Sequence, residues 1–164
     1  MVPIELMKRD LFTFGYEGLS LETFLARLKI AGVRTVIDVR ANPLSRKKGF
    51  SKKALSFALE QTGISYRHIA LMGCPKPVRD KYREDGDWSA YTRGFLSHLT
   101  RNGEALAEVV DIARASPSCL VCFETDFDRC HRAFVARAAA PLGGFRVKHI
   151  TAQKVIFDES RMAA

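Results

Sequence analysis

The hydrophobic positions along the chain switch between two spacings, which predicts strands that alternate with helices. Runs rich in β-branched or aromatic residues predict strands at residues 11–15, 33–39, 64–70, 118–124 and 145–151. Apolar residues three and four positions apart predict helices after Ser20 and after Ser51, at 88–99, around 106–113 and at 130–140. Ser20 and Ser51 are expected as N-caps, and Pro141 with the following glycines is expected to break the last helix.

This alternation predicts an α/β fold, a single three-layer sandwich with an open, mostly parallel sheet of about five strands and helices on both faces. Right-handed crossovers would bring the loops after Gly15, Val39, Ala70 and Glu124 to one edge of the sheet. Ligands of open α/β sheets bind at that carboxyl edge. We therefore expect the functional site there.

We expect one domain over residues 1–164, with a core at about 12–151. Residues 71–87 carry glycines and prolines near their start and many charges later, so they are a candidate lid loop. The tail at 154–164 is expected to be loosely held.

The charge of the chain favours anionic partners. Lys and Arg outnumber Asp and Glu by 26 to 18, a formal net charge of +8. Nucleic acid, nucleotides and phosphorylated metabolites are the partner classes that such a balance favours. The first ten residues lack the apolar core of a signal peptide, and no apolar run approaches the about 18 residues of a membrane span. We therefore expect a cytoplasmic protein without membrane contact, in which the four cysteines are thiols.

The loop after the second predicted strand is strongly basic, with six Lys and Arg residues from Arg40 to Lys53. Arg40 and Arg46 are candidate anion ligands, because arginine binds phosphate or carboxylate through two parallel hydrogen bonds. Ser51 opens a helix, whose free N–H groups also favour anions. The alternative is a solvated charged face, which suits the lysine pairs 47–48 and 52–53 best.

Cys130, His131 and Arg132 open the helix that follows the fourth strand. A helix start and neighbouring cations lower the pKa of a thiol, so Cys130 is a candidate nucleophile; the alternative is a cysteine that only packs. His131 is a candidate acid or base, or a group that binds strand carbonyls. Arg132 is expected to bind an anion or to pair with Glu124 or Asp38.

Glu124 and Asp38 each end a predicted apolar strand. They are candidates for a general acid and base, if their surroundings separate their pKa values. They equally suit a role as partners that fix Arg40 and Arg132.

The sequence does not favour either of two cofactor sites. Cys119 and Cys122, followed by Cys130 and His131, superficially supply three thiols and an imidazole for zinc. However, Cys119 and Cys122 are three apart on a predicted strand and therefore point to opposite faces, so they cannot bind one ion without a break in the strand. The first turn has Gly15 and Gly18 without the third glycine of a dinucleotide fingerprint. We therefore expect no metal site and name no cofactor.

Three motifs in this order resemble the "domain of unknown function 488" family. They are residues 13–18, residues 37–40 with Pro43, Ser45 and Arg46, and residues 122–124 with Cys130-His131-Arg132. The resemblance implies an α/β sandwich and no established activity. It also implies one cluster of Asp38, Arg40, Ser45, Arg46, Glu124, Cys130, His131 and Arg132. The family tends to have Leu-Gly-Gly after its third strand, where this chain has Leu71-Met72-Gly73-Cys74.

Two functions fit these residues. The first is an enzyme that acts on a phosphorylated or nucleotide-like anionic substrate, with arginines that hold the anion and Asp38, Glu124, Cys130 and His131 as catalytic candidates. The second is a non-catalytic nucleic-acid or nucleotide-binding module, which would stack bases on aromatic rings. A third possibility is a scaffold in which the cluster only ties the sheet edge together. Carboxylates repel phosphate, so their presence favours the enzyme.

Overall fold

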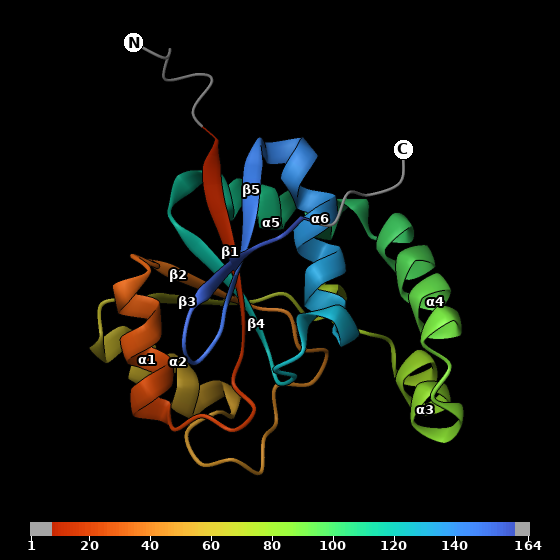
Figure 1. Ribbon diagram of the computed structural model, residues 1–164, viewed down its shortest axis with the longest axis horizontal. Coiled ribbons are helices and arrows are strands. Elements are labelled where there is room, and N and C mark those ends of the chain that lie inside the picture. Colours follow the sequence, from red (N-terminus) through yellow and green to blue (C-terminus); the bar gives the residue numbers. More distant parts are fainter. Residues whose placement is uncertain (1–7, 160–164) are drawn as a thin grey trace.

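The computed structural model describes residues 8–159, which form a three-layer α/β sandwich (Figure 1). The strands of this range are β1 (Arg9–Gly15), β2 (Thr35–Asp38), β3 (Ser65–His68), β4 (Ser118–Cys122), β5 (Phe145–Ile150) and β6 (Val155–Phe157). Its helices are α1 (Leu21–Ile30), α2 (Lys52–Gln61), α3 (Lys76–Asp85), α4 (Trp88–Arg101), α5 (Gly103–Ala115) and α6 (His131–Gly143), with short 3-10 helices η2 (Ala70–Met72) and η3 (Phe127–Arg129). Within residues 8–159, no helix combines the length and the apolar character needed to cross a membrane.

The sheet has the strand order β3-β2-β4-β1-β5-β6, and its first five strands are parallel. The chain goes from β1 to β2 in one direction across the sheet and from β4 to β5 in the other. With right-handed crossovers, this reversal puts the connecting helices on opposite faces. The predicted fold class is thus confirmed, with six strands in the described range where about five were expected.

Two apolar cores flank the sheet, one on each face. The first packs α1 and α2 against the strands and centres on Phe14, Phe24 and Leu55. The second packs α4, α5 and α6 against the other face and includes Phe95 and Val109. The side chains of β4 alternate between them, so Cys119 lies in the first core and Cys122 in the second. The expectation that these two cysteines point apart is confirmed.

The carboxyl ends of β1, β2 and β4 meet in the middle of the sheet. Gly15 is in register with Cys122, and Asp38 with Val121. Directly after β1, Tyr16 N donates a further hydrogen bond to the carbonyl of Cys122, so the two chains stay paired beyond the strand ends. Polar residues that follow the three strands are therefore delivered to one small region, as expected for a parallel sheet.

The secondary structure of residues 71–87 differs from the predicted loop. Residues 76–85 form α3, which starts beside Pro75 and carries Pro77 in its first turn. Proline is tolerated there because the first helical N–H groups have no partner inside the helix. Ion pairs between residues four apart, Lys76 with Asp80 and Lys81 with Asp85, further favour the helix. The sequence pattern does not predict α3, because none of its residues is buried and it therefore has no apolar stripe.

Two predicted ends were also wrong. Helix α6 passes through Pro141 and ends at Gly143, and its C-cap Gly144 adopts a left-handed conformation with φ 70°. Pro141 lies in the last turn, where only one backbone bond is lost. Part of the predicted loose tail forms β6, which pairs antiparallel with β5. The remainder of that tail, 160–164, lies outside the described residues.

Candidate functional site

A cavity of about 860 Å³ opens at the carboxyl edge of the sheet. Its walls come from the ends of β1, β2 and β4, from the loop 40–47, from α3 and the start of α4, and from the start of α6. The lining includes five of the eight residues predicted as catalytic or anion-binding: Arg40, Ser45, Arg46, Glu124 and His131. Parts of the chain that are far apart in sequence therefore share one polar cavity.

The charge of the cavity wall is strongly unbalanced. Six basic side chains line it: Arg40, Arg46, Lys47, Arg79, Arg83 and Arg129. Glu124 is the carboxylate among its lining residues. Arg46, Arg83 and Arg129 are exposed, so their guanidinium groups can reach a ligand without first leaving a buried partner. Positive charge therefore dominates the wall of the cavity.

Aromatic rings form a second part of the wall. Trp88 stacks on Tyr91 with ring centres 4.6 Å apart, and Tyr82 packs edge-on against Trp88. The guanidinium of Arg129 lies over the Trp88 ring, 5.4 Å from its centre. A cation above an aromatic face is stabilised by the ring quadrupole, so this contact orients Arg129 at the mouth of the cavity. Planar rings beside cations suit a ligand with both an aromatic and an anionic part.

Asp38 and Arg40 form a buried pair behind this wall. Arg40 Nε is 2.9 Å from Asp38 Oδ1, and Arg40 Nη2 is 2.7 Å from Oδ2. Arg40 Nη1 donates to the hydroxyl of Tyr16 at 3.0 Å and to the carbonyl of Phe50 at 2.6 Å. Burial alone would lower the pKa of Arg40, but the hydrogen bonds and charge of Asp38 outweigh it and raise the pKa.

Tyr66 completes this pair, because its hydroxyl donates to Asp38 Oδ2. Burial and that carboxylate raise the pKa of Tyr66 well above its ordinary value, so it stays a neutral donor. Nε, Nη1 and Nη2 of Arg40 all donate hydrogen bonds to protein groups, so few of its N–H groups are left for a ligand. This geometry matches the interpretation of Asp38 as the partner that fixes Arg40.

Ser45 and Ser51 shape the basic loop. Ser51 Oγ accepts from Ser45 N at 3.0 Å and donates to the Ser45 carbonyl at 3.2 Å. Ser51 is the N-cap of α2 by position, but its hydroxyl makes no cap hydrogen bond. The hydroxyl instead closes the loop, and this closure sets the position of Arg46 at the cavity rim.

Cys122, Glu124 and Cys130 meet at the inner end of the cavity. Glu124 Oε2 is 3.3 Å from Cys122 Sγ and 3.5 Å from Cys130 Sγ. The two sulfur atoms are 2.6 Å apart, and both cysteines are free. Burial raises the pKa of the Cys122 thiol well above its usual range, and Cys130 adds to this effect while Arg132 opposes it.

His131 lies beside these groups with its orientation fixed. Its Nε2 is 2.6 Å from the carbonyl oxygen of Val39, which can only accept, so Nε2 carries a hydrogen. In the neutral ring Nδ1 then holds a lone pair, and it faces Cys130 Sγ at 3.9 Å. His131 thus joins the end of β2 to the start of α6 and presents an acceptor to the thiol.

Arg132 is fully buried under the same groups. Its Nη1 lies 3.3 Å from Cys122 Sγ and also donates to the Glu124 carbonyl, and its Nη2 donates to the Thr125 carbonyl at 3.3 Å. Its Nε donates to Thr13 Oγ1 at 3.1 Å. Burial would lower the pKa of Arg132, but the sulfur groups of the two cysteines raise it. Arg132 binds the loop that carries Glu124 and lies outside the cavity lining.

A series of hydrogen-bonded side chains continues from Arg132 through Thr13 and His149 to Asp158. Thr13 Oγ1 is 2.6 Å from His149 Nδ1, and His149 Nε2 is 3.0 Å from Asp158 Oδ1. Arg137 closes the chain with an ion pair to Asp158 at 2.9 Å. Because Asp158 accepts from Nε2, a neutral His149 can accept from the Thr13 hydroxyl. Each group in the chain is then satisfied.

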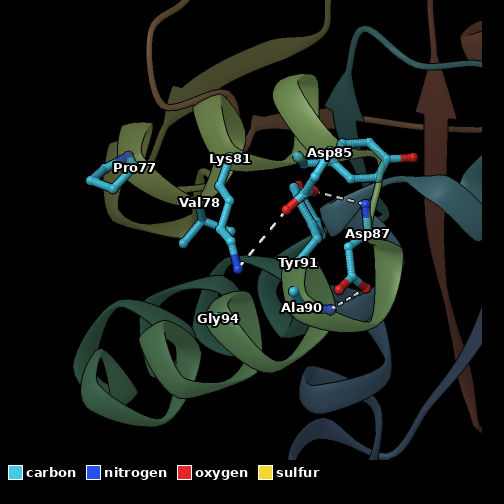
Figure 2. Close-up of a pocket in the computed structure, with 9 residues that line it drawn as sticks. Pro77, Val78, Lys81, Asp85, Asp87, Ala90, Tyr91 and Gly94 are labelled. Atoms are coloured by element: carbon cyan, nitrogen blue, oxygen red, sulfur yellow. Dashed lines mark hydrogen bonds and ion pairs between the residues drawn. The ribbon is translucent and has the colours of Figure 1, made fainter.

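A second, smaller hollow of about 290 Å³ lies between α3 and α4 (Figure 2). Lys81 and Asp85 face each other across its rim at 4.0 Å, and Asp87 caps α4 through Ala90 N. Tyr82 and Tyr91 line both this hollow and the larger cavity. The predicted site residues all lie at the larger one or directly behind it.

Comparison with known families identifies the chain. A family model described as "Domain of unknown function DUF488" matches residues 20–139, which is most of the sequence. The chain belongs to this family. No curated protein and no solved structure matches it. The match covers β2, β4 and the start of α6, and it includes every lining residue of the edge cavity except Tyr16.

After the third strand this chain has Leu71-Met72-Gly73-Cys74 where the family tends to have Leu-Gly-Gly. This difference changes the cavity lining at one position only. Met72 points into the core below α4 and α5, whereas Cys74 lines the cavity. Gly73 between them is required, because a Cβ there would lie 2.2 Å from Ala41 N. The contact between these two backbones holds the rim against the loop that follows β2.

Several cavity residues were missed by the sequence reasoning. Arg79, Arg83 and Tyr82 lie on α3, which the sequence pattern predicts as a loop. The sequence places Cys122 in a family motif and in a zinc-like set, but it does not predict Cys122 as a residue of the site. The available signal was the two-residue spacing between Cys122 and Glu124, which puts both on one side of an extended chain.

Proposed function

We propose that this protein is an enzyme that acts on a phosphorylated or nucleotide-like substrate bound in the edge cavity. The observation that carries the proposal is the cavity wall, in which six basic side chains surround one carboxylate. A surface that only needed solubility would not concentrate arginines around a hollow of this size. The volume of about 860 Å³ suits a ligand of the size of a nucleotide.

In this proposal Arg46, Arg83 and Arg129 hold the anionic group. Their side chains are exposed at the cavity, and arginine binds phosphate through two parallel hydrogen bonds. Trp88 and Tyr82 offer faces on which a base or another planar group can stack. Arg40 and Ser45 contribute by keeping the loop that carries Arg46 in place.

The chemical step falls to the inner wall, where Glu124, Cys130 and His131 meet. Glu124 Oε2 and His131 Nδ1 both approach Cys130 Sγ, at 3.5 Å and 3.9 Å. Asp38 and Arg132 are buried and bonded to protein groups, so we give them positioning roles. The Glu124 carboxylate repels an anionic ligand, so its presence in a basic cavity favours a role in the reaction over a role in binding.

A thermal-shift screen against nucleotides, sugar phosphates and short DNA or RNA, at two salt concentrations, tests this proposal. A ligand at 100 to 1,000 times its Kd stabilises a protein by about 2.7–4.1 kcal/mol. We expect a phosphorylated small molecule to shift the unfolding temperature, and ³¹P NMR to show its conversion by the wild type. Glu124→Gln should bind that molecule and convert it at least about a hundredfold more slowly.

Two results would contradict the proposal that the protein is an enzyme. Binding of nucleic acid alone, lost at high salt, would indicate the non-catalytic module, for which the exposed Lys48, Lys52 and Lys53 beside the cavity are the natural contacts. Binding of a small molecule without conversion under any tested co-substrate would make the cavity a sensor site. The matched control for charge is Arg101→Ala, which removes an exposed arginine outside the cavity lining.

A further inference from the structure

Three side-chain atoms of the kinds that bind transition metals converge on one point at the inner end of the cavity. They are Cys122 Sγ, Glu124 Oε2 and Cys130 Sγ, and all of them lie within 4.8 Å of one another. The first comes from the end of β4, the second from the loop after it, and the third from the N-cap of α6. The three residues are near neighbours in sequence, and the path of the chain between β4 and α6 brings their side chains together.

The two sulfur atoms are too close to be ordinary packing neighbours. Their separation of 2.6 Å exceeds the about 2.05 Å of a disulfide bond and falls below the about 3.5–4.0 Å at which even carbon atoms pack. A separation of this kind suits two thiols that share a hydrogen, form a disulfide or bind one ion. The carboxylate of Glu124 beside both sulfurs favours the ion, because it adds a third ligand of a suitable kind.

The two sulfur–oxygen distances suit a tetrahedral ion of zinc size, whereas the sulfur–sulfur distance is too short for one. Zinc bonds of about 2.3 Å to sulfur and about 2.1 Å to oxygen place sulfur and oxygen roughly 3.6 Å apart. The two separations here are 3.3 Å and 3.5 Å. The sulfur atoms would have to move apart by roughly 1 Å, to about 3.8 Å. A rotation about the Cα–Cβ bond of one or both cysteines would have to supply that movement.

Charge and surrounding hydrogen bonds also fit. Two thiolates and a carboxylate around a divalent ion leave one net negative charge. The guanidinium of Arg132 supplies the opposite charge, since its Nη1 lies 3.3 Å from Cys122 Sγ and it is fully buried. The main-chain N–H of Arg132 points at Cys130 Sγ at 3.5 Å. Donors of this kind orient metal-bound sulfur in known sites.

We propose that Cys122, Glu124 and Cys130 bind one divalent ion of the zinc class. Thiolate ligands select zinc and related borderline metals over magnesium or calcium. Cys122 and Glu124 line the cavity, so an ion bound by them would lie beside it. Three protein ligands with one open position are the arrangement of catalytic zinc sites. The inference goes beyond the proposed function and does not depend on it, because metal binding is measured without substrate.

Cobalt titration of the reduced, chelator-treated full chain tests the site. Co²⁺ bound to thiolate absorbs strongly in the near ultraviolet through sulfur-to-metal charge transfer. We expect this band to saturate at one Co²⁺ per chain and to disappear on addition of Zn²⁺. Cys122→Ser and Cys130→Ser should abolish the band, and Glu124→Gln should keep it while weakening affinity by at least about tenfold. Cys74→Ala and Cys119→Ala are matched controls and should leave it unchanged.

Alkylation of the folded wild type with and without Zn²⁺, read by mass spectrometry, keeps the proposal testable if a serine variant does not fold. Zinc should protect Cys122 and Cys130 and leave the modification of Cys74 as it was. Cobalt binding that survives Cys122→Ser in a folded variant would overturn the proposal. Absence of stoichiometric Co²⁺ or Zn²⁺ binding by the reduced wild type would do so as well, and a Cys122–Cys130 disulfide in the same sample would then identify a redox pair.

Discussion

Arg40 lies flat against the carboxylate of Asp38, and two parallel hydrogen bonds of 2.9 Å and 2.7 Å join them. Asp38 is fully buried and Arg40 is 7% exposed. Asp38 ends β2, while Arg40 reaches across to Tyr16 after β1 and to Phe50 before α2. One ion pair therefore holds together three segments that bound the cavity.

Asp38→Asn should lower the free energy of unfolding by about 3–5 kcal/mol, because it leaves the Arg40 charge buried with an incomplete partner. Urea unfolding measures the change. Arg67→Ala breaks the exposed pair of Arg67 with Glu108, whose side chains are 55% and 48% exposed, and should cost less than about 1 kcal/mol. Equal losses in the two variants would show that the buried pair does not organise the edge.

Gly15→Ala should destabilise the protein and disrupt the inner end of the cavity. A Cβ on Gly15 would lie 1.8 Å from the Glu124 carbonyl oxygen and 3.0 Å from Arg132 Nη1, so the backbone of the Glu124 loop must move. Gly103→Ala is the matched control, because it meets nothing within 4 Å and replaces glycine in a helix. It should be neutral or stabilising by up to about 1 kcal/mol. A Gly15→Ala protein as stable as wild type would refute this packing.

The stability of the protein should fall on acidification in two steps. Burial lowers the pKa of His149 below its ordinary 6.5 although Asp158 opposes this, so the unfolded chain takes up a proton at higher pH than the folded one. Stability from the neutral ring is therefore lost as the pH falls below about 6.5. Burial would raise the pKa of Asp158, but Arg137 and His149 lower it below 3.8, and its contribution is lost at still lower pH.

Urea unfolding midpoints between pH 8 and pH 3 measure these steps. His149→Gln should flatten the upper step, since glutamine does not titrate. It should keep a smaller lower step, because Arg137 still lowers the pKa of Asp158 while the contribution of His149 is lost. Arg146→Gln is a suitable control, because it changes a half-exposed pair with Asp10 outside this chain of contacts. A wild-type midpoint that rises between pH 7 and pH 5 would contradict the proposed state of His149.

Trp88 should report ligand binding in the cavity. It is the single tryptophan of the chain, it lines the cavity, and it lies beneath the guanidinium of Arg129. A ligand that engages Arg129 or stacks on the ring should change the intensity or the emission maximum of its fluorescence. Stopped-flow or equilibrium titration gives the measurement. A ligand that raises the unfolding temperature without any change in Trp88 emission would have to bind elsewhere.

Much of the fold could be predicted because its signals are local. Buried parallel strands leave short apolar runs, and Ser20 caps α1 as its position suggests, accepting from Thr23 N at 3.1 Å. Helix α3 could not be seen in this way, because it has no buried stripe and is held by surface ion pairs and by its contact with α4. The strand β6 is three residues long and depends on its neighbour β5, so its own sequence carries little signal.

The site was predictable as a region rather than as a set of contacts. Parallel strand ends indicate where Asp38, Glu124 and Cys130 gather. They do not indicate which side chains face the cavity and which are hydrogen-bonded inside the protein, because that depends on pairs such as Asp38 with Arg40. The approach of Cys122 to Cys130 depends on the path of the loop and η3 between them, which no periodicity describes.

The most direct test of the central claim, an anion-binding cavity at the sheet edge, is isothermal titration calorimetry. The titrant is the phosphorylated ligand with the largest thermal shift, against wild type, Arg129→Ala and Arg101→Ala. We predict one ligand per chain and a loss of at least about tenfold in affinity for Arg129→Ala, since a hydrogen bond to a charged group contributes about 1.5–3 kcal/mol. Arg101→Ala should stay within about twofold of wild type. Equal weakening by both substitutions, or no binding of any phosphorylated ligand, would contradict the account.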